Sequence, residues 1–268
     1  MKTKLLSVPY LVWMGVFMIV PLLMVAYFAL TDDNGTFTLN YITDVGQYAN
    51  VFVRSVGLSV IATVICLVIA YPIAFLLSGL KQHRSMTIVM IIMLPMWMNF
   101  LLRTYAWMSL LGNNGYINHV LGLIGIGPYK LINTSGAVVL GMVYNYLPFM
   151  ILPLYSVMEK IDPSLYEAAG DLGCNSRQVI TKVVFPLSVP GITLGITMVF
   201  VPAVSTFIIS RMLGGGSNLL IGDLIEMQFL GNAYNPHLGA AISLVLMVIV
   251  LLIMTLMNSF DNEEQVLV

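Results

Sequence analysis

The chain has 268 residues, of which 59% are hydrophobic and 9% are charged, and its formal net charge is −1. Ordinary globular domains carry about 25% charged residues. Together with a mean hydropathy of +0.94, this composition excludes an ordinary soluble domain and indicates an integral membrane protein. The nearly neutral charge gives no indication of a nucleic-acid partner.

Six apolar segments are each long enough to cross a bilayer, which takes about 20 residues. They lie at residues 5–30, 55–80, 86–111, 135–158, 188–210 and 238–258. The first resembles a signal peptide, but it is too long and no small-residue cleavage site precedes the acidic loop that follows it, so we interpret it as a membrane helix. The sequence therefore predicts an all-α, polytopic fold with one transmembrane domain over residues 1–268.

The distribution of Lys and Arg predicts the orientation of these spans. With the N-terminus inside, the cytoplasmic segments hold seven cations and the opposite side holds three; the seven are Lys2, Lys4, Lys81, Arg84, Lys160, Arg177 and Lys182, and the three are Arg54, Lys130 and Arg211. Cytoplasmic loops carry the excess of Lys and Arg. We therefore expect both termini, and the polar segment 159–187, to be cytoplasmic.

The polar segment 159–187 separates two long apolar segments and has the signals of a helical hairpin. Asp162 can cap a helix that begins at Pro163, and Gly173 suits the position just after its end. Ser176 is expected to cap a second helix, which Pro186 is expected to stop.

The first of these two helices is amphipathic. Its apolar residues have the spacing i, i+3, i+4 and i+7, which predicts a packing stripe; they are Leu165, Ala168, Ala169 and Leu172. Glu167 and Asp171 are expected to share the solvent-side face. A surface this polar in a chain this apolar is expected to meet a partner.

The same residues resemble a known motif. Glu167-Ala168-Ala169, then Gly173, then Val183-x-Phe185-Pro186 at the spacing seen here is similar to the EAA loop of ABC importer permease subunits, with Val183 and Phe185 as conservative departures. The resemblance extends over nearly the whole chain to the polyamine (spermidine/putrescine) permease family, through ILPLYSVMEKIDPSLYEAAGDLG, FPLSVPGI and GGGSNLLIGDLI.

This resemblance implies a type I ABC importer permease of a bacterial plasma membrane, with its EAA loop as the helix that couples to the ATPase. The coupling residues would be Glu167, Ala168, Ala169, Gly173 and Pro186. The implied partners are a second homologous permease subunit, an ABC ATPase dimer, an extracytoplasmic polyamine-binding protein and the polyamine itself. ATP and Mg would be bound by the ATPase, so this chain would be a transport subunit rather than an enzyme and would hold no cofactor.

Polar residues within predicted spans are candidates for the translocation pathway, because charge inside a bilayer is costly. Arg103 lies deep in the third span, four residues after Asn99, and Pro95 frees a backbone carbonyl there. The candidates are Trp97, Asn99, Arg103, Tyr105, Tyr144 and Asn145. Arg103 is ambiguous, because a cation is a poor direct ligand for a cationic substrate.

The segments that are expected to face outward are long. Residues 112–134 and 212–237 contain Gly and Asn clusters between short apolar stretches, which predicts brief helices at the outer interface. Asp223 and Glu226, three residues apart on one of them, are expected to project together at the outer mouth; they either attract a polyamine or are ordinary solvated surface charge.

Other classes of function have weaker support. Gly122-x-x-Gly125-x-Gly127 and Gly214-Gly215-Gly216-Ser217 lack the context of nucleotide-binding loops. Cys66 and Cys174 predict no disulfide or metal cluster, and the histidines have no ligand spacing. The alternatives that remain are an ABC permease for another solute, such as ferric ion, thiamine or a phosphonate; a secondary transporter, which needs repeats and an ion site; and a membrane enzyme or scaffold.

Overall fold

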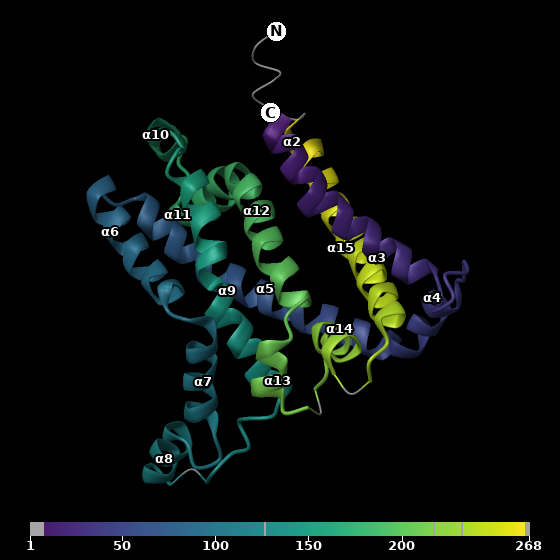
Figure 1. Cartoon of the computed structure of the whole chain (residues 1–268). Helices are drawn as coiled ribbons and strands as arrows, with labels where there is room; N and C mark the ends of the chain where they lie inside the picture. The colour runs from purple at the N-terminus through teal and green to yellow at the C-terminus, as the bar shows by residue number, and fades with distance from the viewer. Residues whose placement is uncertain (1–7, 126, 217, 232, 266–268) are drawn as a thin grey trace.

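The computed structural model describes residues 8–125, 127–216, 218–231 and 233–265, and this part of the chain is almost entirely helical (Figure 1). An isolated bridge between Thr31 and Phe37 closes one loop. The elements in chain order are α2 (Val8–Met14), η1 (Gly15–Ile19), α3 (Val20–Leu30), α4 (Asn40–Asp44), η2 (Val45–Tyr48), α5 (Ala49–Ser78), α6 (Gln82–Met93), η3 (Leu94–Trp97), α7 (Phe100–Leu111), α8 (Tyr116–Leu123), α9 (Ser135–Met158), α10 (Pro163–Asp171), α11 (Ser176–Val179), η4 (Ile180–Val184), α12 (Phe185–Val204), α13 (Ile208–Gly214), α14 (Ile221–Leu230) and α15 (Pro236–Gln265).

Among the described residues, five helices are long and apolar enough to cross a membrane. They are Pro9–Leu30, Asn40–Ser78, Ser135–Met158, Ser176–Val204 and Pro236–Met257. A sixth candidate is a bent pair, Gln82–Trp97 with Phe100–Leu123. The prediction of a polytopic, all-α chain is confirmed.

The third predicted span, residues 86–111, is not one helix. The chain bends by 86° between Trp97 and Phe100. Pro95 lacks an N–H group and begins the short η3 turn. Asn99 then starts a new helix, because its Oδ1 accepts hydrogen bonds from the N–H groups of Leu101 at 2.8 Å and Leu102 at 3.4 Å.

The fifth predicted span, residues 188–210, also has different bounds. Its helix begins earlier, within the polar hairpin, and ends at Val204. The Ser205 hydroxyl bonds to the carbonyl of Val201 at 3.0 Å, and the N–H of Thr206 bonds to the carbonyl of Ala203 at 3.4 Å, which tightens the final turn. A separate short helix, α13, then follows.

The main hydrophobic core lies among α5, α9 and α12. Helix α5 presents small buried side chains to this core, namely Ala62, Cys66, Ala70 and Ala74. Helix α12 approaches α9 closely at Gly195, where an added Cβ would lie 2.6 Å from Sδ of Met150. Small residues let membrane helices pack with their backbones close together.

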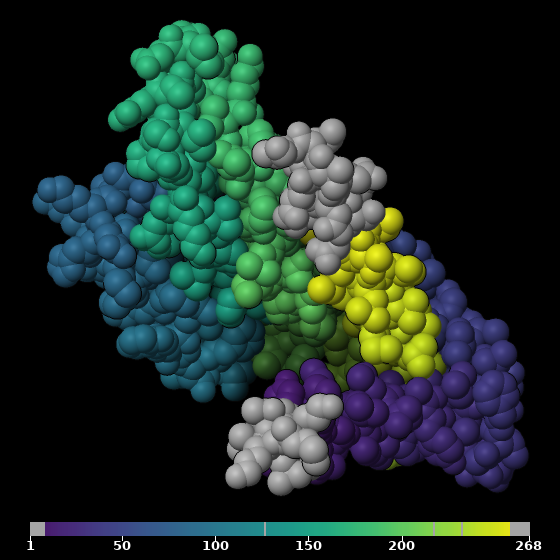
Figure 2. All heavy atoms as spheres, turned by 90° about the horizontal axis from the view of Figure 1, so that it is seen from above, coloured from purple at the N-terminus to yellow at the C-terminus, as the bar shows by residue number. Residues whose placement is uncertain are grey.

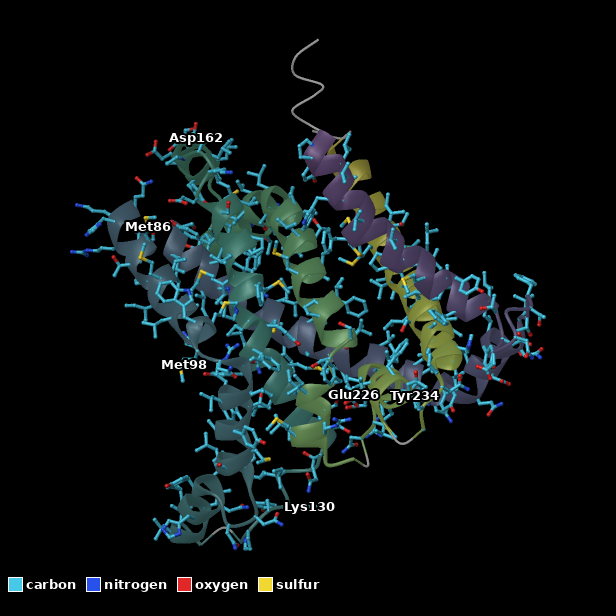
Figure 3. All side chains as sticks on the ribbon, in the orientation of Figure 1. Met86, Met98, Lys130, Asp162, Glu226 and Tyr234 are labelled. Atoms are coloured by element: carbon cyan, nitrogen blue, oxygen red, sulfur yellow. The ribbon has the colours of Figure 1, made fainter. Side chains whose placement is uncertain are left out.

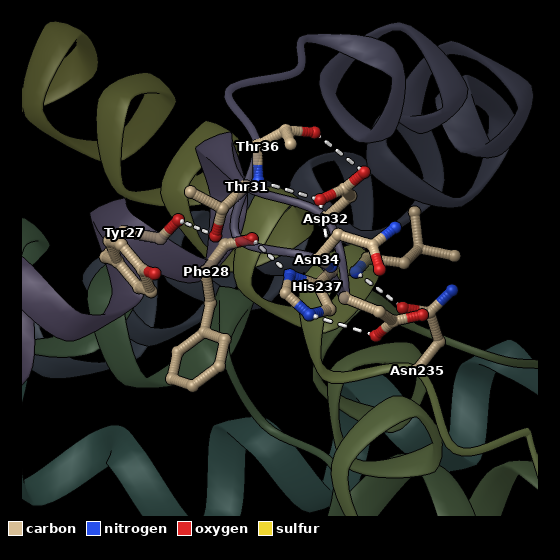
Figure 4. A network of polar contacts seen from close by, with 10 residues as sticks. Tyr27, Phe28, Thr31, Asp32, Asn34, Thr36, Asn235 and His237 are labelled. Atoms are coloured by element: carbon tan, nitrogen blue, oxygen red, sulfur yellow. Dashed lines mark hydrogen bonds and ion pairs between the residues drawn. The ribbon is translucent and has the colours of Figure 1, made fainter.

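A second core joins α3, α14 and α15, and a polar network ties their loops together (Figure 4). The His237 ring donates a hydrogen bond from Nδ1 to the carbonyl of Phe28, 2.9 Å away, and its Nε2 lies 3.3 Å from Oδ1 of Asp33. The ring also stacks on Tyr41 with the centroids 5.4 Å apart. His237 therefore fastens the start of α15 to the end of α3.

The long helices run between two opposite ends of the molecule. Helix α10, the start of α2 and the end of α15 lie at one end, whereas α8, α13 and α14 lie toward the other (Figure 1). Seen toward the first end, the α10–η4 region projects at one side, well apart from α15 (Figure 2).

Candidate functional site

The polar hairpin begins with the predicted cap. Oδ1 of Asp162 accepts a hydrogen bond from the N–H of Ser164 at 2.9 Å, and Pro163 occupies the first helical position. This backbone N–H lowers the pKa of the Asp162 carboxyl below its ordinary value. Asp162 stands at the outer tip of this end of the molecule (Figure 3).

The turn of the hairpin depends on Gly173, whose φ of +78° lies in the left-handed region that glycine favours. The N–H of Cys174 bonds to the carbonyl of Ala169 at 3.0 Å, which satisfies the end of α10. The predicted cap of the second helix is wrong: Asn175, not Ser176, caps α11, because Asn175 and Gln178 exchange hydrogen bonds at 2.9 Å in a capping box.

Pro186 does not stop the second helix, contrary to the prediction. The helix runs from Ser176 to Val204, with the π-helical turn η4 directly before the proline. In this wide turn the N–H of Phe185 bonds to the carbonyl of Ile180, five residues earlier. The turn places Pro186 in the first turn of α12, where the missing N–H is tolerated.

The apolar stripe of α10 does not pack as the spacing predicts. Ala169 is buried, but Ala168 is exposed, and Leu172 is 84% exposed. Glu167 is exposed as well. One side of the hairpin is held by the main core, against which Ile161, Tyr166 and Val179 pack. A mixed apolar and acidic surface therefore faces away from the described part of the chain.

Three of the pathway candidates lie at or close to the bend between α6 and α7. Trp97 is 87% exposed beside the break, and the Asn99 side chain is used as the helix cap. Arg103 is 8% exposed with its guanidinium 5.9 Å from the ring centroid of Phe100, and its Nε has no hydrogen-bond partner among the described residues. Arg103 is therefore held inside the fold rather than reaching outward.

The remaining pathway candidates lie on different helix faces. Tyr105 is exposed on α7. Tyr144 packs edge-on against Trp107 with the ring centroids 5.3 Å apart, which joins α9 to α7. The neighbouring Asn145 is buried and donates its Nδ2 proton to the carbonyl of Gly141 at 2.8 Å. The structure thus does not gather the six candidates into one cluster.

Asp223 and Glu226 do not project together as expected. Asp223 turns inward, where its Oδ2 accepts a hydrogen bond from the N–H of Leu220 at 3.0 Å. Glu226 instead pairs with Arg211 of α13, whose Nη1 lies 3.0 Å from Oε1. This hydrogen bond raises the pKa of the Arg211 guanidinium.

Sequence reasoning missed the role of Arg211 and the loop around Asn218. Asn218 Nδ2 donates to the carbonyl of Gly214 at 2.9 Å, and its Oδ1 accepts from the hydroxyl of Ser135 at 3.3 Å. The partners are far apart in sequence, so a local pattern gives no signal. An Arg and a Glu 15 residues apart, on separate short helices, likewise have no periodic relation.

The apolar helices and the exposed hairpin are those of a multi-pass membrane protein. The model of the family described as "Binding-protein-dependent transport system inner membrane component" matches residues 3–262. The chain belongs to this family.

Among curated proteins, the chain is 40% identical to the spermidine/putrescine transport system permease protein PotB of Haemophilus influenzae over 251 residues, covering 90% of this chain and 87% of that protein. It is 37% identical to PotB of Escherichia coli over 247 residues, covering 88% and 90%. Among solved structures, a bacterial ABC transporter involved in alginate import matches with a TM-score of 0.83 at 16% identity, covering 98% of this chain and 95% of that chain. At this identity the structural likeness supports the fold alone.

Proposed function

We propose that the chain is a permease subunit of an ATP-driven polyamine importer, forming half of its translocation pathway. The observation that carries the proposal is the 40% identity to a spermidine/putrescine permease across 90% of the chain. The similarity favours this cargo over ferric ion, thiamine or a phosphonate, because the two curated relatives described above are named for spermidine and putrescine transport.

The α10–η4 hairpin is the proposed contact with a separate ATPase dimer. Its support is the surface that faces away from the described chain, where Glu167, Ala168 and Leu172 are exposed. Ala169 and Gly173 fix the shape of this surface, the first by packing and the second by its backbone conformation. Pro186 lies in the first turn of α12, the helix that we propose carries a displacement of the hairpin into the membrane.

The orientation follows from this contact. An ATPase uses cytoplasmic ATP, so the hairpin lies in the cytoplasm of a bacterial cell whose inner membrane holds the chain. The start of α2 and the end of α15 lie at the same end (Figure 1). ATP and Mg bind to the ATPase, and this chain needs no cofactor. A second permease subunit and an extracytoplasmic polyamine-binding protein complete the assembly.

The candidates near the bend, and Tyr144 and Asn145 on α9, form separate proposed parts of the pathway on this chain. Trp97, Tyr105 and Tyr144 offer exposed aromatic faces to an ammonium group, and each such contact contributes about 0.5–2 kcal/mol. The other three candidates have separate local roles: Asn99 caps α7, Arg103 is buried, and Asn145 bonds to its own helix.

Uptake of labelled spermidine into proteoliposomes containing the complete complex, with and without internal ATP, tests the proposal. We expect ATP-dependent uptake in the presence of the binding protein, and its loss in Glu167→Lys. If the ATPase co-purifies but neither spermidine nor putrescine is taken up, the assignment of polyamines as the cargo is wrong and the proposed coupling role stands. If Glu167→Lys transports like wild type, the coupling role of the hairpin is wrong.

A further inference from the structure

A cavity of about 290 Å³ lies between α13 and α14, toward the end of the molecule opposite the hairpin. Its size is at the lower limit of small-molecule sites, which occupy roughly 300–1,000 Å³. Its walls combine one carboxylate with polar and apolar side chains, namely Ser210, Arg211, Asn218, Leu219, Asp223 and Met227. Glu226, which pairs with Arg211 beside the cavity, is labelled in Figure 3.

Asp223 is 2% exposed, and half of its carboxylate has no partner. Oδ2 accepts the N–H of Leu220 at 3.0 Å, whereas Oδ1 has no hydrogen-bond donor among the described residues. Burial raises the pKa of the Asp223 carboxyl. The hydroxyl of Ser210 lies close enough to lower the pKa of this carboxyl in part, although in the observed geometry it donates its proton to the carbonyl of Phe207 at 2.9 Å. A buried acceptor without a donor is costly unless a ligand satisfies it.

The charges around the cavity leave one negative charge uncompensated. Arg211 is the cation among the residues that line it, and both of its terminal nitrogens are engaged by Glu226. The charges of Arg211 and Glu226 therefore cancel, and the ionised form of Asp223 carries the remaining negative charge. A ligand that carries one positive charge and hydrogen-bond donors would complete the site.

We propose that this cavity binds a primary ammonium group at one end of a linear alkylamine, with Oδ1 of Asp223 as the acceptor. The inference rests on the proposed polyamine function and names a substrate subsite within it. Ser210 Oγ, which keeps a free lone pair after donating to Phe207, is placed to accept a second N–H. Leu219 and Met227 cover the first methylene groups of the chain.

An alkylammonium ion suits this site better than a metal ion. Hard cations such as Ca²⁺ and Mg²⁺ take about six or more oxygen ligands at short range. Here Asp223 supplies one free carboxylate oxygen, and most of the wall is apolar. No group of three His, Cys, Asp or Glu residues that could hold a metal occurs in the described ranges.

Thermal unfolding of the purified permease–ATPase complex, without binding protein, tests the site directly. Putrescine at saturation is expected to raise the Tm of the wild-type complex, because a ligand that binds the folded state stabilises it, and NaCl at equal ionic strength is the control for screening. In Asp223→Asn we expect an unliganded Tm equal to or above that of wild type, since a buried charge is removed, and an apparent Kd for putrescine raised at least tenfold. Asp44→Asn, the same change at an exposed carboxylate, is the matched control and is expected to keep the wild-type Kd.

A second variant covers the case in which Asp223→Asn does not assemble. Met227→Lys places a tethered ammonium group at the cavity wall, and we expect it to raise the Tm without ligand and to abolish the putrescine-dependent shift. A wild-type putrescine shift in either variant overturns the inference, as does a shift in wild type that NaCl reproduces.

Spermidine uptake by the wild-type complex separates the inference from the proposed function. If spermidine uptake is present but both cavity variants keep the wild-type Tm shift with putrescine, the proposed ammonium subsite is wrong and the proposed import function is retained. If uptake is absent while the shift depends on Asp223, the ammonium site stands and the polyamine-import function falls. If wild type shows neither uptake nor shift, both are wrong.

Discussion

Replacing Gly173 by alanine isolates the contribution of hairpin shape to transport. Gly173 has a φ of +78°, and no described atom lies within 4 Å of the Cβ that alanine would add. The substitution therefore introduces backbone strain without a steric clash. An L-residue in the left-handed region costs about 1–2 kcal/mol, which corresponds to a factor of about 5–30 in an equilibrium.

We expect ATP-dependent uptake to fall by about this factor if the ATPase recognises the observed turn. The assay is the initial rate of labelled spermidine uptake into proteoliposomes, normalised to the amount of assembled complex. Binding-protein-stimulated ATP hydrolysis, measured on the same vesicles, shows whether the loss is in coupling. Equal amounts of membrane-inserted protein are expected, because Gly173 lies outside the candidate spans.

Gly125→Ala is the matched control, because the structure gives it the same perturbation at the other end of the molecule. Its φ is +75°, and no described atom lies within 4 Å of the added Cβ. We expect nearly wild-type ATP hydrolysis in this variant. Equal losses in Gly125→Ala and Gly173→Ala would refute the reasoning, because strain alone would then explain the effect; so would wild-type uptake in Gly173→Ala.

Three further substitutions test other parts of the structure. Gly222→Ala would place a Cβ 2.5 Å from the carbonyl oxygens of Ser205 and Thr206; we expect a loss of about 1–3 kcal/mol, seen as a lower Tm of the complex, and an unchanged Tm would contradict the packing. Asn118→Ala removes the side chain that bonds the carbonyls of Gly112, Asn113 and Tyr129; faster proteolysis after α8 is expected, and wild-type resistance would count against it. Asp162→Ala removes the cap of α10. Because the pKa of Asp162 is lowered in the folded state, the stabilisation that this carboxylate gives to α10 is present above the ordinary pKa of 3.8 and is lost as pH falls below it. Hydrogen exchange in α10 of the variant should therefore be faster than in wild type at neutral pH but not at strongly acidic pH.

Hydropathy predicts where the chain crosses the membrane but not where a span breaks. The range 135–158 coincides with α9, because polar residues on both sides of this apolar segment define where the helix begins and ends. The bend before α7 lies within an equally apolar run. Pro95 is visible in the sequence, but the Asn99 side chain could equally face a pore or cap a helix, and local pattern does not separate these outcomes.

Local rules predict the ends of α10 better than they predict its contacts. Asp162, Pro163 and Gly173 act within one or two turns of the chain, so their roles follow from sequence. The spacing of Leu165 and Leu172 identifies an apolar face but not the molecule that covers it. In this chain that face is exposed, which is the outcome expected when the covering surface belongs to another protein.

The error at Asp223 and Glu226 has a related cause. A separation of three residues places two side chains on neighbouring parts of a helix. However, Asp223 lies in the first turn of α14, where its carboxylate turns back to the free N–H of Leu220. Glu226 is drawn to Arg211, a residue of another helix. The direction of each side chain was thus decided by partners that helical periodicity does not include.

One continuous helix joins the two ends of the molecule at which we place function. It starts in the hairpin at Ser176, passes through the π-turn η4 and ends at Val204. Directly after its end, the carbonyls of Ser205 and Thr206 touch Gly222 at the start of α14, the helix that carries Asp223. This contact leaves no room for even a methyl group, so we expect a displacement of the hairpin along this helix to affect the base of α14. The proposed amine cavity therefore lies beside the segment that connects to the proposed coupling hairpin.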